Sequence, residues 1–156
     1  MASEVAVPVR DANAPDADDI HSAALCAWKE ARGEGVDGMR AVLWVLKNRV
    51  GVQGFASKLH DVIYGKNQFT SMSVPSDPEF NLEPEDNDSM FAVAMKVATS
   101  LFDGDGTDDV DLTRKAHYYA NLHLVATDGW FYKDIVLDPY KNHPVTAQIG
   151  HHTFFA

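Results

Sequence analysis

Apolar residues recur at three- and four-residue spacing in three long stretches of the chain, and this pattern predicts its main helices. The helices are expected over about 20–33, 37–50 and 90–102. In the second of them, Trp44 and Val45 widen the apolar stripe, which is typical of a helix buried on more than one side. We therefore expect this helix to lie at the centre of the core.

Polar side chains mark where the helices are expected to begin. Asp18 or Asp19 is placed to cap the first helix, and Asn87 or Asp88 to cap the last. Ser57 is placed to cap a further short helix that closes at a Tyr-Gly pair. Each of these side chains can accept a hydrogen bond from a backbone N–H that the first helical turn leaves unpaired.

The remaining stretches lack helical periodicity. Residues 74–85 contain three prolines and predict a long loop, of the kind that tends to be functional or mobile. Residues 130–155 are aromatic and β-branched, which predicts extended segments or a short β-hairpin. Residues 1–18, rich in Ala, Asp and Pro, predict a flexible acidic tail. We therefore expect a mainly α, single domain over residues 19–156 with long loops.

Composition and charge narrow the classes of partner. The chain has 156 residues, of which 46% are hydrophobic, enough for one core. Its 13 basic and 23 acidic residues give a net charge of −10, which argues against nucleic acid as a partner. The same charge disfavours binding to an anionic surface. No run approaches the ~18 apolar residues that a membrane span needs, so we expect no membrane insertion. A monomer is expected, made in the cytoplasm without a signal peptide.

Glu30 is the first candidate for chemistry. It lies in the last turn of an otherwise apolar helix, directly before a glycine-rich break at residues 33–38. This setting is partly desolvated and faces a cleft, as an acid that donates a proton near neutral pH requires. The negative end of the helix dipole would also help the carboxyl group to hold its proton.

Four motifs in a fixed order resemble a known family. They are Glu30-Ala-Arg-Gly-Glu34 with Lys47-Asn-Arg-Val50, Tyr64-Gly-Lys-Asn-Gln-Phe-Thr70, Asp111-Leu-Thr113 with Ala116-His-Tyr-Tyr-Ala-Asn121, and Ile149-Gly-His-His-Thr-Phe-Phe155. Together they resemble the SleB-type cell-wall hydrolases, which include spore-cortex-lytic enzymes and some phage endolysins. The chain departs from the family pattern where Asp-Leu-Thr replaces the usual Asp-Pro-Thr.

The resemblance implies a lysozyme-like fold that cleaves the β-1,4 bond between N-acetylmuramic acid and N-acetylglucosamine in peptidoglycan glycan strands, often as a lytic transglycosylase. Glu30 matches the catalytic glutamate of the family, and no cofactor or metal is implied. Gln68, Tyr118, Tyr119 and Asn121 match family positions that line the sugar groove. Trp130 and Glu34 are further candidates for substrate binding, although Trp130 fits a role in closing the core equally well. Glu34 would be a second carboxylate near Glu30 if the helix continued, but Gly33 is expected to end the helix first, which favours a structural or substrate-steering role for Glu34.

Two outcomes of the expected reaction stay open. With one carboxylate, Glu30 acts as acid and then as base on the muramic acid 6-hydroxyl, which closes an anhydro ring. With water as the nucleophile the protein is instead a muramidase. The absent signal sequence favours a phage or prophage endolysin released through a separately encoded membrane pore, with a virion-associated lysin as the other route.

Other classes of protein remain as alternatives. A zinc amidase or peptidase would use some of the five histidines His117, His123, His143, His151 and His152, although no His-Glu-x-x-His motif is present. A cysteine amidase would need Cys26 at a helix N-terminus, and we expect it in mid-helix. The acidic run 103–109 suggests weak divalent binding at most. A glycan-binding module without activity is the last alternative.

Overall fold

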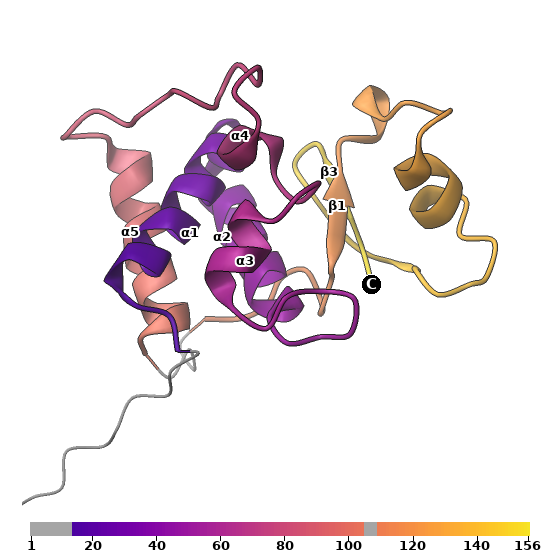
Figure 1. Ribbon diagram of the computed structural model, residues 1–156, viewed down its shortest axis with the longest axis horizontal. Coiled ribbons are helices and arrows are strands. Elements are labelled where there is room, and N and C mark those ends of the chain that lie inside the picture. The colour runs from indigo at the N-terminus through magenta and orange to yellow at the C-terminus, as the bar shows by residue number, and fades with distance from the viewer. Residues whose placement is uncertain (1–13, 105–108) are drawn as a thin grey trace, which may run out of the picture.

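Two helices of 15 residues each, α1 (Ala17–Ala31) and α2 (Gly35–Arg49), form the centre of the structure, which is a computed structural model (Figure 1). The short 3-10 helix η1 (Arg32–Glu34) joins them. α5 (Ser89–Phe102) packs against both helices, and so does α3 (Leu59–Tyr64). The three long helices expected from apolar spacing are confirmed, each beginning one to three residues earlier than expected.

The structure describes residues 14–104 and 109–156. α1 begins at Ala17 because Asp16 caps it: the Asp16 carboxylate accepts a hydrogen bond from the Asp19 backbone N–H at 2.8 Å. The Asp19 side chain accepts one in return from the Asp16 N–H at 3.0 Å, which completes a capping box. The expectation that Asp18 or Asp19 is the cap is therefore wrong. Most of the expected tail lies outside the described residues.

Of the two other expected caps, one is confirmed and one is wrong. Asp88 caps α5 through a hydrogen bond from the Phe91 N–H at 2.8 Å, as expected. Lys58, not Ser57, precedes α3, and no side chain caps that helix. α3 is held instead by burial of its apolar face, since Leu59, Val62 and Ile63 are at most 1% exposed.

Small side chains on α1 let the central helices pack closely. Ala23, Ala24 and Ala27 are fully buried where α1 meets its neighbours. On α2, Leu43 and Val45 are also fully buried, which confirms α2 as the central helix. None of the helices within residues 14–104 and 109–156 combines the length and the hydropathy that crossing a bilayer requires.

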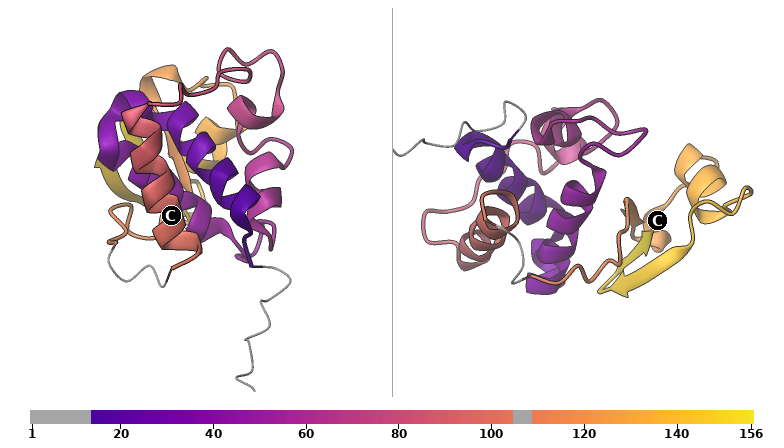
Figure 2. Two further views of the ribbon diagram at one scale, coloured as in Figure 1. Left: turned by 90° about the vertical axis from the view of Figure 1, so that its left-hand side faces the viewer. Right: turned by 90° about the horizontal axis from the view of Figure 1, so that it is seen from below.

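A three-stranded antiparallel sheet lies beside the helices (Figures 1 and 2). Its strands are β1 (Tyr118–Ala120), β2 (Val145–Ile149) and β3 (His152–Phe155), in the order β1-β3-β2. β2 and β3 form the short hairpin that the sequence predicts, and Gly150 supplies the positive φ of 59° in its turn. β1 is a third strand that the sequence analysis did not predict.

The segment between β1 and β2 is partly helical, contrary to the expected extended chain. It contains the 3-10 helix η2 (Leu122–Leu124) and the π-helix η3 (Phe131–Val136). Ile135 is the buried residue of η3, and Phe131 packs edge-on against Phe155 with ring centroids 6.0 Å apart. An apolar run this short has no readable period, so sequence spacing does not distinguish it from a strand.

Polar side chains at the end of α2 attach the sheet to the helices. Asn48 Nδ2 donates hydrogen bonds to the Asp111 carboxylate at 3.0 Å and to the Ala116 carbonyl at 3.1 Å. Arg49 Nε donates to the His117 carbonyl at 2.7 Å. These bonds reach the chain just before β1, so they fix where β1 lies relative to α2.

The proline-containing stretch is an irregular loop, as expected, and residues of α1 and η1 anchor it. Lys29 Nζ donates a hydrogen bond to the Phe80 carbonyl at 2.7 Å, and Arg32 Nη2 forms an ion pair with Glu79 at 2.8 Å. The loop follows a short helix, α4 (Thr70–Ser73), that the sequence analysis missed. It passes over the end of the helices in Figure 1 before α5 begins.

Candidate active site

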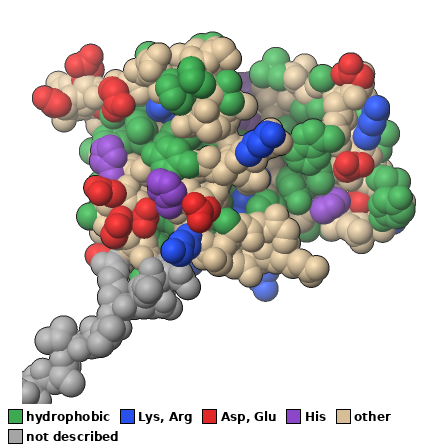
Figure 3. Space-filling model, viewed as in Figure 1, with side chains coloured by type: hydrophobic (Ala, Val, Ile, Leu, Met, Phe, Trp, Pro, Cys, Tyr) green, Lys and Arg blue, Asp and Glu red, His purple; other side chains and the backbone are tan. Residues whose placement is uncertain are grey.

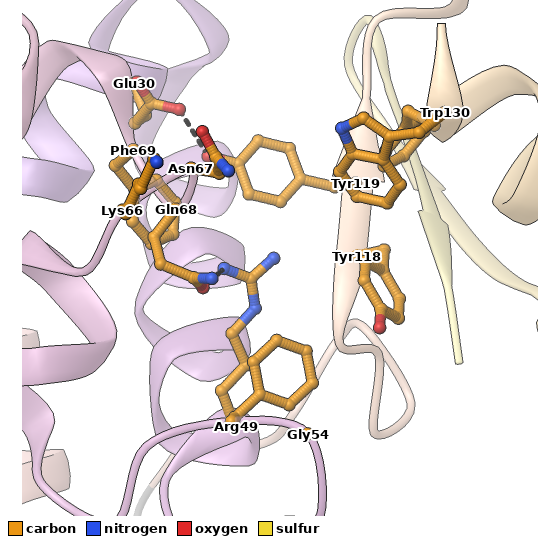
Figure 4. Close-up of a pocket in the computed structure, with 12 residues that line it drawn as sticks. Glu30, Arg49, Gly54, Lys66, Asn67, Gln68, Phe69, Tyr118, Tyr119 and Trp130 are labelled. Atoms are coloured by element: carbon orange, nitrogen blue, oxygen red, sulfur yellow. Dashed lines mark hydrogen bonds between the residues drawn. The ribbon is translucent and has the colours of Figure 1, made fainter.

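A cavity of about 530 Å³ lies between the helices and the sheet. The face shown in Figure 3 is hollowed between these two parts. The helical side of the cavity includes Glu30, Arg49, Lys66, Gln68 and Phe69, and the other side includes Tyr118, Tyr119, Trp130 and Phe131 (Figure 4). Five of the seven residues proposed from the sequence therefore lie at one cavity.

Glu30 is held at both of its carboxyl oxygens. The Tyr119 hydroxyl donates a hydrogen bond to Oε1 at 2.7 Å, and the Ser71 hydroxyl donates one to Oε2 at 2.9 Å. A hydroxyl group can donate to a carboxylate or accept from a carboxylic acid. The two contacts can therefore persist when Glu30 gains or loses a proton, and they fix the direction in which its carboxyl group points.

Tyr119 reaches Glu30 from the opposite side of the cavity. Its ring packs against His152 and Phe154, with centroids 5.0 and 5.5 Å away. Burial, and after it the negative charge of Glu30, raises the pKa of the Tyr119 phenol well above its usual value. The phenol therefore keeps its proton and serves as a hydrogen-bond donor.

Ser71 is a site residue that the sequence analysis missed. It is 1% exposed, and its backbone carbonyl accepts a hydrogen bond from Lys29 Nζ at 3.2 Å. Lys29 precedes Glu30 in α1, so one helix holds both the carboxyl group and the residue that orients it. Ser71 directly follows the Gln-Phe-Thr motif, and its adjacency to that motif was the only available signal.

Arg49 is the second residue that the sequence analysis did not assign to the site. It ends α2, is 7% exposed, and donates a hydrogen bond from Nη1 to Gln68 Oε1 at 3.2 Å. Its guanidinium group lies 5.0–5.8 Å from the ring centroids of Phe55, Phe69 and Tyr118. Its place in the Lys47-Asn-Arg-Val50 motif was the available signal.

Tyr118 and Trp130 contribute aromatic surface to the cavity. Tyr118 packs between Phe55, at 5.7 Å, and His143, at 5.2 Å. Trp130 is 57% exposed and packs edge-on against Phe131 at 5.5 Å. An exposed indole at the edge of a polar cavity is suited to stacking on a sugar ring.

Glu34 and Asn121 do not line this cavity. Glu34 accepts a hydrogen bond from the His151 backbone N–H at 2.9 Å and contacts the His151 ring at 3.0 Å. These hydrogen bonds lower the pKa of Glu34. They also hold the β2–β3 turn against η1. Asn121 caps η2 by accepting a hydrogen bond from the His123 N–H at 3.1 Å. Both side chains have local structural partners.

The alternative chemistries find little support in the part of the chain that the structure describes. No group of three or more His, Cys, Asp and Glu side chains there is arranged to hold a metal ion. Burial lowers the pKa of His117 and of His152, which disfavours their charged forms. Cys26 is fully buried in the middle of α1, and burial raises the pKa of its thiol. Residues 105–108 of the acidic run lie outside the described residues.

The fold and the cavity define a class of protein. A mainly α domain with a carboxyl group at the end of its first helix, facing an aromatic cavity, is lysozyme-like. The chain belongs to the cell wall hydrolase family, whose model matches residues 33–155. Because the match begins three residues after Glu30, the role of Glu30 remains a prediction from motif and geometry.

Similar proteins agree with this class. The chain is 30% identical over 136 residues to the spore cortex-lytic enzyme of Oceanobacillus iheyensis. The aligned region covers 87% of this chain and 41% of that protein. The chain thus spans about two fifths of this curated relative. Two solved catalytic domains are similar in structure. The SleB catalytic domain of Bacillus cereus has a TM-score of 0.65 and 27% identity, and the match covers 94% of this chain and 98% of that domain. The catalytic domain of the germination-specific lytic transglycosylase SleB of Bacillus anthracis has a TM-score of 0.65 and 28% identity, and the match covers 96% of this chain and 100% of that domain. The SleB-type resemblance and the lysozyme-like fold are confirmed.

Proposed function

We propose that this protein cleaves peptidoglycan glycan strands at the β-1,4 bond between N-acetylmuramic acid and N-acetylglucosamine, as a lytic transglycosylase. The observation that carries the proposal is the Glu30 carboxyl group, held at the cavity by hydrogen bonds from Tyr119 and Ser71. Family membership and the SleB-like fold support the substrate class, and the described activity of the Bacillus anthracis relative supports the reaction.

In the first step Glu30 donates its proton to the glycosidic oxygen as the bond to C1 of muramic acid breaks. The leaving sugar departs with a hydroxyl group, and C1 gains oxocarbenium character. In the second step the 6-hydroxyl of the same muramic acid attacks C1, and the Glu30 carboxylate takes the hydroxyl proton. The anhydro ring closes, and Glu30 is again protonated for the next cycle.

Within the part of the chain that the structure describes, no second carboxylate lines the cavity, which favours this route over hydrolysis. Glycosidases that use water commonly place two carboxyl groups about 5–9.5 Å apart. Among the described residues that line the cavity, Glu30 is the only acidic one. Glu34, the sequence candidate for a second carboxylate, is bound to His151 instead. An internal nucleophile needs one carboxyl group, which acts first as acid and then as base.

Product analysis tests the proposal. The purified protein is incubated with peptidoglycan, and the soluble products are separated and weighed by mass spectrometry. Muropeptides with anhydro-muramic acid ends are expected. Reducing muramic acid ends would mean a muramidase, and released peptides with intact glycan would contradict glycan cleavage altogether.

The biological role as a phage or prophage endolysin stays a proposal. Co-expression in bacteria with a membrane pore protein tests it. Lysis that needs both proteins is expected, whereas lysis by this protein alone would contradict release through a separate pore.

A further inference from the structure

The Arg49 guanidinium group is a buried charge whose position is fixed. Nε donates to the His117 carbonyl at 2.7 Å, Nη1 donates to Gln68 at 3.2 Å, and aromatic rings surround the group. In Figure 4 it points into the space between Gln68 and the two tyrosines of β1. Such a group cannot swing out to solvent as a surface arginine does.

Within residues 14–104 and 109–156, no carboxylate forms an ion pair with Arg49, and Nη2 has no hydrogen-bond partner. Glu30 lines the same cavity, but Ser71 and Tyr119 hold its two oxygens. Burial lowers the pKa of Arg49, because the charge is taken out of water without a contacting anion. Burying a charge of this kind costs free energy unless an oppositely charged group pairs with it.

The charge around the cavity differs in sign from that of the whole chain. Arg49 and Lys66 line it against the single carboxylate of Glu30, whereas the chain carries a net charge of −10. A low-dielectric cleft focuses the field of the charges in its walls. An anionic group is therefore attracted to this cavity although the protein as a whole repels it.

We propose that the Arg49 guanidinium binds a carboxylate that the muramic acid carries on its 3-substituent, an inference that rests on the proposed glycan-cleaving function. Two sources supply this chemistry. They are the lactyl carboxylate of a muramic acid without a stem peptide, and a carboxylate of the stem peptide itself. The Arg49–carboxylate contact selects strands that contain muramic acid over neutral N-acetylglucosamine polymers, and it places muramic acid beside Glu30.

Chemical amidation of the substrate tests this assignment on the unaltered protein. Peptide-free and peptide-bearing glycan strands are each compared with a preparation in which methylamine and a carbodiimide have converted the carboxylates to neutral amides. Cleavage is followed by chromatography of the products. Loss of a hydrogen bond to a charged group predicts a fall in kcat/KM of about tenfold or more, mainly through KM.

The pattern of loss identifies the source. A fall on amidating peptide-free strands assigns the lactyl carboxylate, and a fall confined to peptide-bearing strands assigns the stem peptide. Cleavage of all four preparations at rates within about twofold would overturn the inference and leave the proposed function standing. If wild-type protein cleaves no preparation, the proposed function fails. Calorimetric binding of the Glu30→Gln variant to the four preparations then still tests the carboxylate contact, and equal affinities would overturn it.

Variants of Arg49 provide a second measurement. Arg49→Gln is expected to lose the preference for strands with free carboxylates, and Arg49→Lys to retain part of it, because lysine keeps the charge without the planar fork. Lys96→Gln removes one positive charge from an exposed position on α5 and is the matched control. Circular dichroism checks that each variant folds. An Arg49→Gln protein that folds and still prefers carboxylates would contradict the proposal.

Discussion

The helical part of the molecule, which contains α1 to α5, and the sheet part, which contains β1 to β3 with η2 and η3, contribute different kinds of side chain to one cavity. Glu30 and Arg49 come from the ends of α1 and α2, whose buried residues form much of the core. Tyr118, Tyr119 and Trp130 come from the sheet part, where Trp130 and several other large apolar side chains are exposed. The charged groups therefore lie on the more deeply buried part, and the aromatic faces lie on the part with less buried surface.

Two hydrogen bonds connect these parts at the cavity, from Tyr119 to Glu30 and from Arg49 to the His117 carbonyl. Proton transfer needs a carboxyl group held in a fixed direction, and a well-packed helix end provides that. Sugar binding tolerates more movement in the aromatic wall. The comparison predicts that loss of Glu30 on the helical side abolishes activity, whereas changes on the sheet side weaken it.

The largest effect is expected at Glu30. Glu30→Gln removes the proton donor and should lower kcat on glycan strands by on the order of 10²-fold or more. Glu34→Gln, four residues away and outside the cavity, is the matched control and should keep most of the activity. A Glu30→Gln protein with more than about a tenth of the wild-type rate would eliminate Glu30 as the acid.

A large effect on stability, rather than on activity, is expected in the helical core. Leu43 is fully buried, so Leu43→Ala should lower the free energy of unfolding by about 2–5 kcal/mol. Leu124 in the sheet part is 82% exposed, and Leu124→Ala should change stability by less than about 0.5 kcal/mol. Urea denaturation measures both, and similar losses would refute the contrast between the two parts.

A smaller loss of activity is expected at Tyr119. Tyr119→Phe keeps the ring and removes the hydroxyl that orients Glu30, so kcat should fall by about tenfold with little change in KM. Tyr118→Phe removes the neighbouring hydroxyl, which does not bond to Glu30, and serves as the control. If KM rises instead and kcat holds, Tyr119 binds substrate rather than orienting the acid.

The smallest effect is expected at the Glu34–His151 contact. The pKa of Glu34 is lower in the folded protein than its ordinary value of 4.5, so the stabilisation is present above pH 4.5 and is lost as the pH falls through the lowered value. Thermal unfolding measured across this range should show a smaller loss for Glu34→Gln than for wild type. Parallel curves would show that the contact adds no pH-dependent stability.

Apolar spacing was enough to predict the long helices, because α1 and α5 each bury an apolar face and α2 buries apolar residues on more than one side. It was not enough for α1's exact start, since Asp16 and Asp19 cap the helix as a pair and either aspartate looks suitable in sequence. β1 and η3 depend on contacts with distant segments, which local spacing does not report. The hairpin was predictable because a Gly-containing turn separates two β-branched and aromatic runs.

The motifs predicted only part of the site, since Trp130 lies outside them and Arg49, which lies within one of them, was missed. Glu30, Gln68 and Trp130 lie at the cavity as proposed. Ser71 and Arg49 were missed, because serine and arginine have many structural uses and only the fold brings these two to the cavity. Glu34 does not lie beside Glu30, because α1 ends at Ala31 and η1 turns the Glu34 side chain toward the hairpin, in agreement with the structural role that an early helix end favours.

The central claim is that one carboxyl group cleaves the glycan strand with an internal nucleophile. Cleavage of peptidoglycan in water enriched in oxygen-18, followed at once by mass spectrometry of the products, tests it most directly. The account predicts anhydro-muramic acid ends that carry no label from the solvent. Labelled oxygen at C1 of new reducing muramic acid ends would show that water is the nucleophile and would contradict the claim.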